Sequence, residues 1–325
     1  MCTAVSFRTP DLYFGRTLDA ESTLGEEIVI RPRNALLSLR NAPPVRAELP
    51  IIGIAHMEGG TPLWYDGMNR AGLCMAALRF PDFSAAFPFP VAGRLTLATF
   101  ELIPWVLGSC STVAEARERL DGVILSAEDY SDRLPCAPLH WMLADERETV
   151  VLEQTAYGLA LHDDPAQVLT NSPPLPDQLR ALTTHAALSP DPPRRTCLPG
   201  VEPIAFSEGL GSEGLPGGLS SPARFLRAAF TAAHALREGD ADRRLLQCFH
   251  IMGSVEQVEG CCRTWSGGLE RTQYTVCYDT KRLTCCYTTY ENRQINAVSL
   301  SPTAADGTGL LRYPLRREMD IRVQG

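Results

Sequence analysis

Hydrophobic and polar positions alternate along the first 80 residues, a pattern that is typical of β-strands separated by short turns. Residues 3–7 and 12–18 both alternate and flank a proline turn at residues 8–11, so together they predict a hairpin. Three further strands are predicted in this part of the chain: residues 27–31, 51–57 and 73–80. The last two are nearly all apolar, which indicates strands that are buried on both faces.

Helical spacing of apolar residues appears next, over residues 95–107, where it is broken near Pro104, and over residues 113–120. The second of these follows Thr112, and Glu115 lies three residues beyond Thr112, as in a capping box. Strand patterns then return in four short segments: residues 139–144, 149–154, 159–162 and 168–171.

Residues 189–221 are rich in proline, glycine and serine and predict a long exposed loop. A helix is predicted over residues 222–237, with a serine N-cap and a proline in its first turn, and a second over residues 240–252. Three strands complete the chain: residues 273–278, 283–290 and 296–300. We find no internal repeat and no domain boundary, so residues 1–325 predict a single α/β domain with helices outside and sheets inside.

Composition excludes several classes of protein. The 325 residues are 45% hydrophobic and 21% charged, which is enough apolar material for a sizeable core. A net charge of −8 argues against nucleic acid or an anionic membrane surface as the main partner. The sequence has no uninterrupted apolar run of about 18 residues, and its first ten residues do not resemble a signal peptide. We therefore expect a cytoplasmic protein with no membrane partner.

The eleven cysteines do not form a metal-binding or redox pattern. None of them belongs to a CxxC motif, and the six histidines are scattered without an HExxH or HxH motif. We therefore expect no metal and predict that most of these cysteines are reduced, buried thiols that act as small hydrophobic residues.

Cys2 differs from the other cysteines because of its position. A small second residue permits removal of Met1, which would leave Cys2 with a free α-amine whose pKa of about 7.7–8 suits a general base. Nucleophile and base would then belong to one residue. The hairpin brings Arg16 beside Cys2 as the cation that a thiolate needs, and Asp19 is placed to hold the α-ammonium. The residues alone also fit a simpler interpretation, in which Cys2 is a small second residue, Arg16 a solvated charge and Asp19 a turn residue.

A set of motifs in a fixed order resembles the choloylglycine hydrolase family, the N-terminal nucleophile amidases that include bile salt hydrolases and penicillin V acylases. The resemblance spans some 290 residues, which makes it far more specific than any one motif. The matching segments are MCTAVSF at residues 1–7, YFGRTLD at 13–19, YDGMNRAGL at 65–73, LHWMLAD at 139–145, VLTNSP at 168–173, GLPGGLSSPARF at 214–225, RTQYTVCYD at 271–279 and YENRQINA at 290–297.

The resemblance implies a four-layer αββα sandwich of the N-terminal nucleophile hydrolase type, and a homotetramer, as in many family members. It implies that Cys2 is the nucleophile after loss of Met1, that Arg16 is the cation beside the sulfur, and that Asp19 is the partner of the free amine. Asn171 corresponds to an oxyanion-hole amide, and Arg224 to an arginine that supports the nucleophile. Neither a metal nor an organic cofactor is implied.

One position departs from the family pattern. Arg79 stands where bile salt hydrolases have an asparagine of the oxyanion hole, within Ala77-Leu78-Arg79-Phe80-Pro81. Penicillin V acylases also lack asparagine there, so we expect the backbone N–H of Arg79 to supply the second oxyanion donor. Its long cation would attract a carboxylate or sulfonate of the substrate, or would crowd the site. Five further residues lie near the motifs and are candidates to line an apolar substrate cavity: Leu18, Ala20, Met57, Tyr65 and Phe80.

The activity implied is hydrolysis of the amide bond of glycine- or taurine-conjugated bile acids through a thioester. Three alternatives remain open at this point. The acyl group could be that of penicillin V or another N-acyl compound, the thioester could pass to an amine instead of water, or the chain could be a catalytically silent binding protein.

Overall fold

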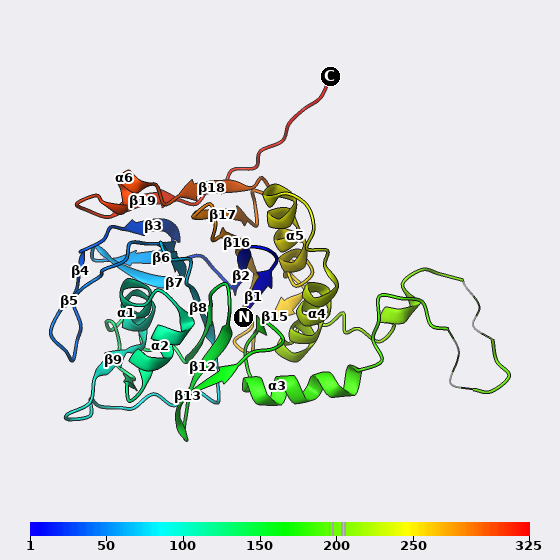
Figure 1. Ribbon diagram of the computed structural model, residues 1–325, viewed down its shortest axis with the longest axis horizontal. Coiled ribbons are helices and arrows are strands. Elements are labelled where there is room, and N and C mark those ends of the chain that lie inside the picture. Colours follow the sequence, from blue (N-terminus) through cyan, green and yellow to red (C-terminus); the bar gives the residue numbers. More distant parts are fainter. Residues whose placement is uncertain (195, 197, 203, 205) are drawn as a thin grey trace.

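The computed structural model describes residues 1–325 with the exception of residues 195, 197, 203 and 205. Those four positions belong to the predicted loop at residues 189–221, so that part of the prediction lies outside the described residues. The rest of the loop carries only the short 3₁₀ turn Leu210–Ser212, and it projects away from the body of the molecule (Figure 1).

Two large antiparallel sheets lie at the centre of the molecule (Figure 1). The first contains both the N-terminal strands and the C-terminal meander, in the order β14-β1-β2-β16-β17-β18, with β15 paired to β16. Its strands are β1 (Cys2–Arg8), β2 (Leu12–Ala20), β14 (Val168–Leu169), β15 (Cys262–Arg263), β16 (Leu269–Asp279), β17 (Thr284–Thr289) and β18 (Asn296–Ser299).

The second sheet has the order β13-β12-β11-β8-β7-β6-β3-β19. Its strands are β3 (Glu27–Arg31), β6 (Ile51–Glu58), β7 (Thr61–Asn69), β8 (Cys74–Arg79), β11 (Leu139–Ala144), β12 (Thr149–Thr155), β13 (Gly158–Asp163) and β19 (Leu311–Pro314). Two small pairs stand apart from both sheets: β4 (Leu36–Leu37) with β5 (Val45–Arg46), and β9 (Thr96–Ala98) with β10 (Ile124–Ser126).

Helices cover the outer face of each sheet (Figure 1). Helices α1 (Leu102–Ser109) and α2 (Val113–Leu120) pack on the second sheet, while α4 (Ser221–His234) and α5 (Ala241–Gly253) pack on the first. The shorter helices are α3 (Leu175–Leu182), α6 (Pro302–Ala305) and the 3₁₀ turns Thr99–Glu101 and Thr183–His185. The layers therefore follow the expected αββα order.

Two apolar clusters hold these layers together. One contains side chains of both sheets and of α4 and α5, such as Val276 from β16 and Met68 from β7, both fully buried. The other joins the second sheet to α1 and α2. Because residues of both sheets share one cluster, the sheets pack face to face and exclude water between them.

The β1–β2 hairpin forms as the alternation predicts. Its register places Cys2 opposite Leu18 and Ala4 opposite Arg16. Side chains two residues apart point to the same face of a strand, so Cys2 and Arg16 project from the same face of the first sheet. The hairpin thus brings the guanidinium of Arg16 into contact with the thiol of Cys2.

Helix starts agree with the capping signals, whereas several elements were not predicted. Thr112 accepts from the Glu115 N–H, but the Glu115 carboxylate bonds the Ser111 N–H instead of completing a capping box with Thr112. The segment 95–107 was predicted as one helix; its first residues instead form β9 and a 3₁₀ turn, and Pro104 stands in the first turn of α1, where proline is tolerated. The unpredicted elements are β7, α3 and β19 and the short β4, β5, β10, β15 and α6. No helix among the described residues is long and apolar enough to cross a membrane.

Candidate active site

The thiol of Cys2 lies at the wall of the largest cavity described, which has a volume of about 860 Å³. Cys2 is only 2% exposed, because β1 is an interior strand with β2 on one side and β14 on the other. Its Sγ lies 3.5 Å from Nη2 of Arg16, so a full positive charge stands within contact distance of the sulfur. Such a neighbour favours the thiolate over the thiol.

Arg16 keeps its charge although it is buried. Its Nη1 donates to Oδ2 of Asp66 at 3.1 Å and also contacts the Tyr274 hydroxyl, and its Nη2 donates to the Ala77 carbonyl at 3.2 Å. Burial by itself lowers the pKa of Arg16, but Tyr274, Cys2 and Asp66 outweigh it and raise that pKa above its ordinary value. The guanidinium is therefore a permanent cation beside the sulfur.

Asp66 is the counter-ion of this cation and is itself held by two phenols. Its carboxylate accepts from the hydroxyls of Tyr274, at 2.6 Å, and Tyr278. Burial raises the pKa of Asp66, and Arg16 and the two phenols oppose that rise. The Tyr274–Asp66–Arg16 chain fixes the guanidinium from behind and leaves its other edge toward Cys2.

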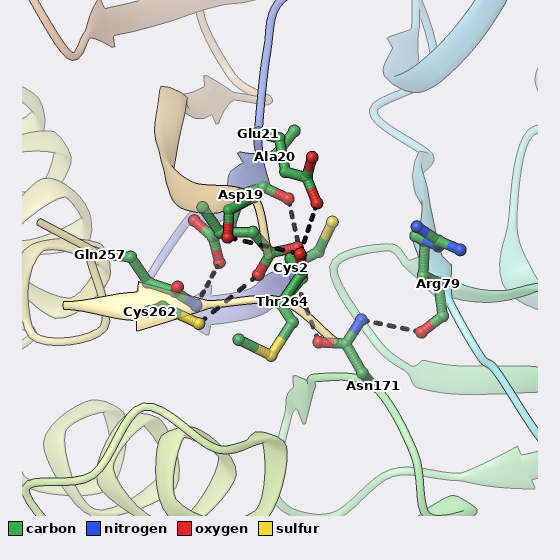
Figure 2. Close-up of polar contacts among 12 residues, drawn as sticks. Cys2, Asp19, Ala20, Glu21, Arg79, Asn171, Gln257, Cys262 and Thr264 are labelled. Atoms are coloured by element: carbon green, nitrogen blue, oxygen red, sulfur yellow. Dashed lines mark hydrogen bonds and ion pairs between the residues drawn. The ribbon is translucent and has the colours of Figure 1, made fainter. Parts of the chain in front are cut away.

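Met1 is present, and its ammonium and carbonyl groups form hydrogen bonds with the backbone of Asp19. The Met1 ammonium donates to the Asp19 carbonyl at 2.6 Å and forms an ion pair with Glu270 at 2.8 Å, while the Asp19 N–H donates to the Met1 carbonyl at 2.8 Å. The Asp19 carboxylate instead accepts from the Thr272 hydroxyl. It also accepts from the side-chain amide of Gln257 (Figure 2). Burial raises the pKa of Asp19, and Arg224 and the N-terminal charge oppose that rise.

Asn171 bonds the nitrogen of Cys2 (Figure 2). The Cys2 N–H donates to Oδ1 of Asn171 at 3.1 Å, and the Arg79 carbonyl accepts from Nδ2 of Asn171 at 2.8 Å. With Met1 attached, the Cys2 nitrogen is an amide with a single hydrogen, and this hydrogen goes to Asn171 and not to Asp19. Nδ2 of Asn171 carries a second hydrogen, so it can donate to a further acceptor.

Arg224 ties the same groups together from α4. Its Nη2 donates to Oδ1 of Asn171 at 2.6 Å, and its Nη1 donates to the Cys2 carbonyl and to Oγ1 of Thr3 at 2.5 and 2.6 Å. Burial lowers the pKa of Arg224, and the charges of Asp19 and Cys2 oppose that change. Arg224 therefore fixes both the nucleophile's backbone and the amide of Asn171.

The backbone of Arg79 faces Asn171 because of the sheet pairing. The N–H of Phe80 donates to the Pro138 carbonyl at 2.8 Å, which makes Phe80 the hydrogen-bonded residue at the end of the β8–β11 pair. In an antiparallel pair, the neighbouring residue turns its N–H and C=O to the opposite side. Both backbone groups of Arg79 are therefore directed to the side where Asn171 lies.

A buried polar network supports the segment that carries Asn171. The Asn171 N–H donates to Oγ of Ser221, and the Asn171 carbonyl accepts from Nε2 of Gln178. One residue earlier, the Thr170 carbonyl contacts Nε2 of His140 at 3.0 Å. These bonds hold a segment that no strand pairing holds, because β14 ends at Leu169.

The cavity has a largely apolar wall, and its charged lining residues are Arg16, Asp19, Glu21, Glu26, Arg79 and Glu270. Its apolar lining includes Leu24, Leu63, Trp64, Phe100, Ile103 and Leu134. Arg79 is the only described arginine or lysine of the lining whose side chain is exposed, and its guanidinium makes no hydrogen bond or ion pair with described residues. A cavity of this size and kind suits a large apolar ligand that carries a polar or anionic end.

Three of the five candidate lining residues border this cavity and two do not. Leu18, Ala20 and Tyr65 line it. Phe80 is fully buried and stacks on the ring of His140 with the centroids 4.3 Å apart, and Met57 packs on the outer apolar cluster of the second sheet. The alternation of side chains along a strand explains the difference, because it sends Phe80 away from the cavity that Arg79 lines.

Sequence reasoning did not single out Asp66, Tyr274 or Glu270. The signal for Asp66 was available: it is an acidic residue inside a nearly apolar strand, where a buried charge requires a partner. Among the described residues, no group of three or more His, Cys, Asp or Glu side chains is arranged to hold a metal ion.

Comparisons with known proteins agree with this geometry. The chain is 40% identical over 318 residues to the bile salt hydrolase/transferase of Lactiplantibacillus plantarum, and the match covers 98% of each chain. It is 30% identical to the bile salt hydrolase/transferase of Clostridium perfringens, with 99% of each chain covered.

Solved structures show the same fold. The C2A mutant of the conjugated bile acid hydrolase from Clostridium perfringens superposes with a TM-score of 0.93 at 29% identity over the full length of both chains. Penicillin V acylase from Agrobacterium tumefaciens superposes with a TM-score of 0.78 at 19% identity, covering 96% of this chain and 90% of its own, which shows a shared fold alone.

Residues 2–313 match the family described as linear amide C–N hydrolases, choloylglycine hydrolase family. That match begins at Cys2 and covers every residue of the site described above. The chain therefore belongs to the choloylglycine hydrolase family of linear amide C–N hydrolases.

Proposed function

We propose that this enzyme is a bile salt hydrolase, which cleaves the amide bond of glycine- or taurine-conjugated bile acids with Cys2 as its nucleophile. One observation carries the proposal: a thiol at the wall of a large apolar cavity lies 3.5 Å from a buried, permanently charged arginine. The names of the relatives from Lactiplantibacillus plantarum and Clostridium perfringens, both bile salt hydrolase/transferases, support the same substrate class.

The first step requires removal of Met1, which turns the Cys2 nitrogen from an amide into an amine. The amine accepts the thiol proton, and the sulfur attacks the amide carbonyl of the substrate. Arg16 stabilises the thiolate as it forms. Asn171 and Arg224 hold the nitrogen and carbonyl of Cys2, so the new amine has a fixed position next to its own thiol.

The tetrahedral intermediate needs donors for its oxyanion. The second hydrogen of the Asn171 amide and the backbone N–H of Arg79 are our candidates, because the Asn171 amide bonds the Arg79 carbonyl and the Arg79 N–H faces the same side. Loss of one such donor typically reduces kcat by about 10²–10³. The protonated amine of Cys2 then gives its proton to the leaving glycine or taurine as the C–N bond breaks.

A thioester between Cys2 and the acyl group remains. Water attacks its carbonyl with the Cys2 amine as base, the S–C bond breaks, and the proton returns to the sulfur. In this scheme Asp19 orients the amine. Its carboxylate is held by Thr272 and Gln257, and its backbone groups are released when Met1 leaves.

The test is an amide-hydrolysis assay with glycocholate, taurocholate and penicillin V, using protein whose N-terminus has been checked by mass spectrometry. We expect hydrolysis of one or both bile salts, and loss of it in Cys2→Ala and Cys2→Ser with the fold intact by circular dichroism. Full activity in Cys2→Ala, or in protein that retains Met1, would overturn the proposal.

The same assay separates the remaining alternatives. Hydrolysis of penicillin V alone would indicate a penicillin acylase with this site. Formation of a bile acid–amino acid conjugate in the presence of a free amino acid would show that an amine intercepts the thioester. No activity on any of the three substrates would favour a catalytically silent binding protein.

We further propose that the enzyme acts as a homotetramer in the bacterial cytoplasm. The ten cysteines that are described are all free, which suits a reducing compartment. Exposed apolar side chains gather on the projecting segment, among them Leu198, Val201 and Phe206, and exposed apolar groups of this kind favour contact with another chain. Light scattering coupled to gel filtration tests the oligomeric state, and cell fractionation tests the location.

A further inference from the structure

Trp265 borders the same cavity as Cys2, yet it has no packing partner of its own. Its side chain is fully exposed, with a relative exposure of 108%. An indole offers a large flat apolar surface whose burial against a ligand is strongly favourable. We propose that Trp265 is a specificity-determining residue whose ring packs on the acyl group, and that Glu21 holds it in position. This inference rests on the proposed function and adds a substrate contact to it.

The loop that carries Trp265 is a closed turn between β15 and β16. The Thr264 N–H donates to the Gly268 carbonyl and the Gly267 N–H donates to the Thr264 carbonyl, both at 2.9 Å. Nη1 of Arg263 adds a bond to the Gly267 carbonyl at 2.8 Å. Three bonds within residues 263–268 fix the backbone, so Trp265 projects from a rigid support.

Glu21 attaches this loop to the cavity wall. Its Oε1 accepts from the hydroxyl of Thr264 at 2.7 Å (Figure 2). It also accepts from the hydroxyl of Ser266 at 3.2 Å, so both residues that flank Trp265 are bonded to Glu21. Glu21 directly follows β2, whose last residue, Ala20, pairs with Arg271 of β16. The two loops therefore extend from the same end of two neighbouring strands, and together they form one side of the cavity mouth.

Gly268 permits this attachment. A Cβ at position 268 would overlap the Glu21 carboxylate, so any larger residue would push that carboxylate away from Thr264 and Ser266. The backbone of Gly268 does not need the left-handed region, so alanine is compatible with the turn itself. Glycine at 268 is thus needed for the contact with Glu21 and not for the shape of the loop.

The rest of the wall indicates what Trp265 would contact. The cavity has an apolar lining that extends well beyond Cys2 and consists of Leu24, Leu63, Phe100, Ile103 and Leu134. A tryptophan at the mouth extends this apolar surface outward, so it matches an acyl group that is long, rigid and apolar. The fused rings of a bile acid have this shape, whereas a short acyl chain bound at Cys2 would not extend to the mouth.

Kinetics of Trp265→Ala on two substrates test the inference. We expect the KM for glycocholate to rise about tenfold or more, with kcat within about twofold, because truncating a tryptophan that packs on a ligand costs binding of this order. Hydrolysis of N-acetylglycine should be unchanged, and Trp265→Phe should restore most of the loss. The matched control is Tyr157→Ala: Tyr157 is equally exposed, but it lies on the β12–β13 turn and does not line the cavity.

Two further variants test the role of Glu21. Glu21→Ala and Gly268→Ala should each raise the KM for glycocholate in the same direction, although less than Trp265→Ala, because the loop keeps its own three hydrogen bonds. A KM for glycocholate that stays the same in Trp265→Ala, or an equal loss on both substrates, would overturn the inference.

Calorimetric binding of free cholate to the Cys2→Ala protein, with and without Trp265→Ala, separates this inference from the proposed function. If the unmodified enzyme hydrolyses no bile salt but cholate binding weakens on loss of Trp265, the proposed function is wrong and the contact between Trp265 and the acyl group is retained. If loss of Trp265 changes neither the hydrolysis of bile salts nor the binding of cholate, the proposed contact is wrong and the proposed function is retained. A protein that neither hydrolyses bile salts nor binds cholate would overturn both.

Discussion

The charge of Arg16, which lines the cavity, depends on Asp66 and Tyr274, which do not line it. A guanidinium that is 1% exposed is stable only because Asp66 neutralises it and Tyr274 bonds both groups. A buried pair is costly to break, since removal of one partner leaves an uncompensated charge in a low-dielectric interior. The charge beside the Cys2 sulfur is therefore stabilised by Asp66 on β7 and Tyr274 on β16, and positioned by the hairpin that carries Arg16.

Asp66→Asn should destabilise the protein and inactivate it together. We expect the free energy of unfolding to fall by about 3–5 kcal/mol, because Arg16 remains buried without its counter-ion. Urea denaturation measures this change. Asp177→Asn is the control, since Asp177 pairs with Arg180 on the exposed surface of α3, and its loss should have little effect. Equal effects of the two substitutions would contradict the assignment of Asp66.

Arg79→Asn tests whether the exposed cation at the cavity recognises the charge of the leaving group. We expect kcat/KM for glycocholate to fall about five- to tenfold, because an unpaired guanidinium that lines the cavity can bond a carboxylate. Cholylglycinamide, which has no charge, should lose nothing. Since our proposal assigns only the backbone of Arg79 to the oxyanion site, a loss shared by both substrates would show that the side chain supports catalysis and not recognition.

At the scale of elements, the sequence predicted the parts of the site that lie on regular structure. The alternation in residues 3–7 and 12–18 was enough to bring Arg16 to Cys2, because hairpin register follows from a short turn. The N-cap signals before residues 113 and 222 predicted two helix starts, because an N-cap side chain accepts from an N–H of the first helical turn next to it in the sequence.

The segment around Asn171 could not be predicted in this way. Residues 168–171 read as one strand, yet pairing with β1 ends at Leu169, and the following residues are held by side chains from distant parts of the chain. Asn171 was identified through family resemblance, and its partners Ser221 and Arg224 belong to α4, far from Asn171 in sequence. No local pattern encodes such contacts.

Asp164, in the turn between β13 and β14, gives an element-scale prediction about pH. Burial raises its pKa to about 7, although the N–H groups of Ala166, Gln167 and Val168 favour the charged form. Between about pH 4 and pH 7 the unfolded chain has lost this proton while the folded chain keeps it. Folding therefore becomes less favourable as pH rises through this range, by up to about 4 kcal/mol from this one group.

Asp164→Asn should remove this dependence. Asparagine keeps an oxygen for the N–H groups of Ala166 and Gln167 but carries no charge. We expect the variant to melt at a higher temperature than the unmodified protein at pH 8, and the gain to be much smaller at pH 5. Asp163→Asn is the control, because the Asp163 carboxylate is exposed. A stabilisation that is the same at both pH values would contradict the prediction.

At the scale of the whole molecule, the element order predicted helices outside and sheets inside but not which strands share a sheet. The first sheet joins the first 20 residues to β16, more than 240 residues later, and the second joins β3 to β19. Sequence separation of this size leaves no periodic signal, and the four-layer order came from the family resemblance. It is this long-range closure that brings Asp19, on β2, to Thr272 and Glu270, on β16.

The shared core between the sheets predicts that the chain unfolds as one unit. Side chains of both sheets lie in one apolar cluster, so neither sheet can separate without exposing the other's face to water. We expect the loss of secondary structure by far-ultraviolet circular dichroism, of aromatic packing by near-ultraviolet circular dichroism and of amide hydrolysis to coincide in urea. Met68→Ala, a change in β7 at this interface, should move all three curves together and cost about 2–5 kcal/mol. If amide hydrolysis persisted after the second sheet had melted, the two sheets would be independent units. Activity would then not require the ion pair that joins Arg16 of the first sheet to Asp66 of the second.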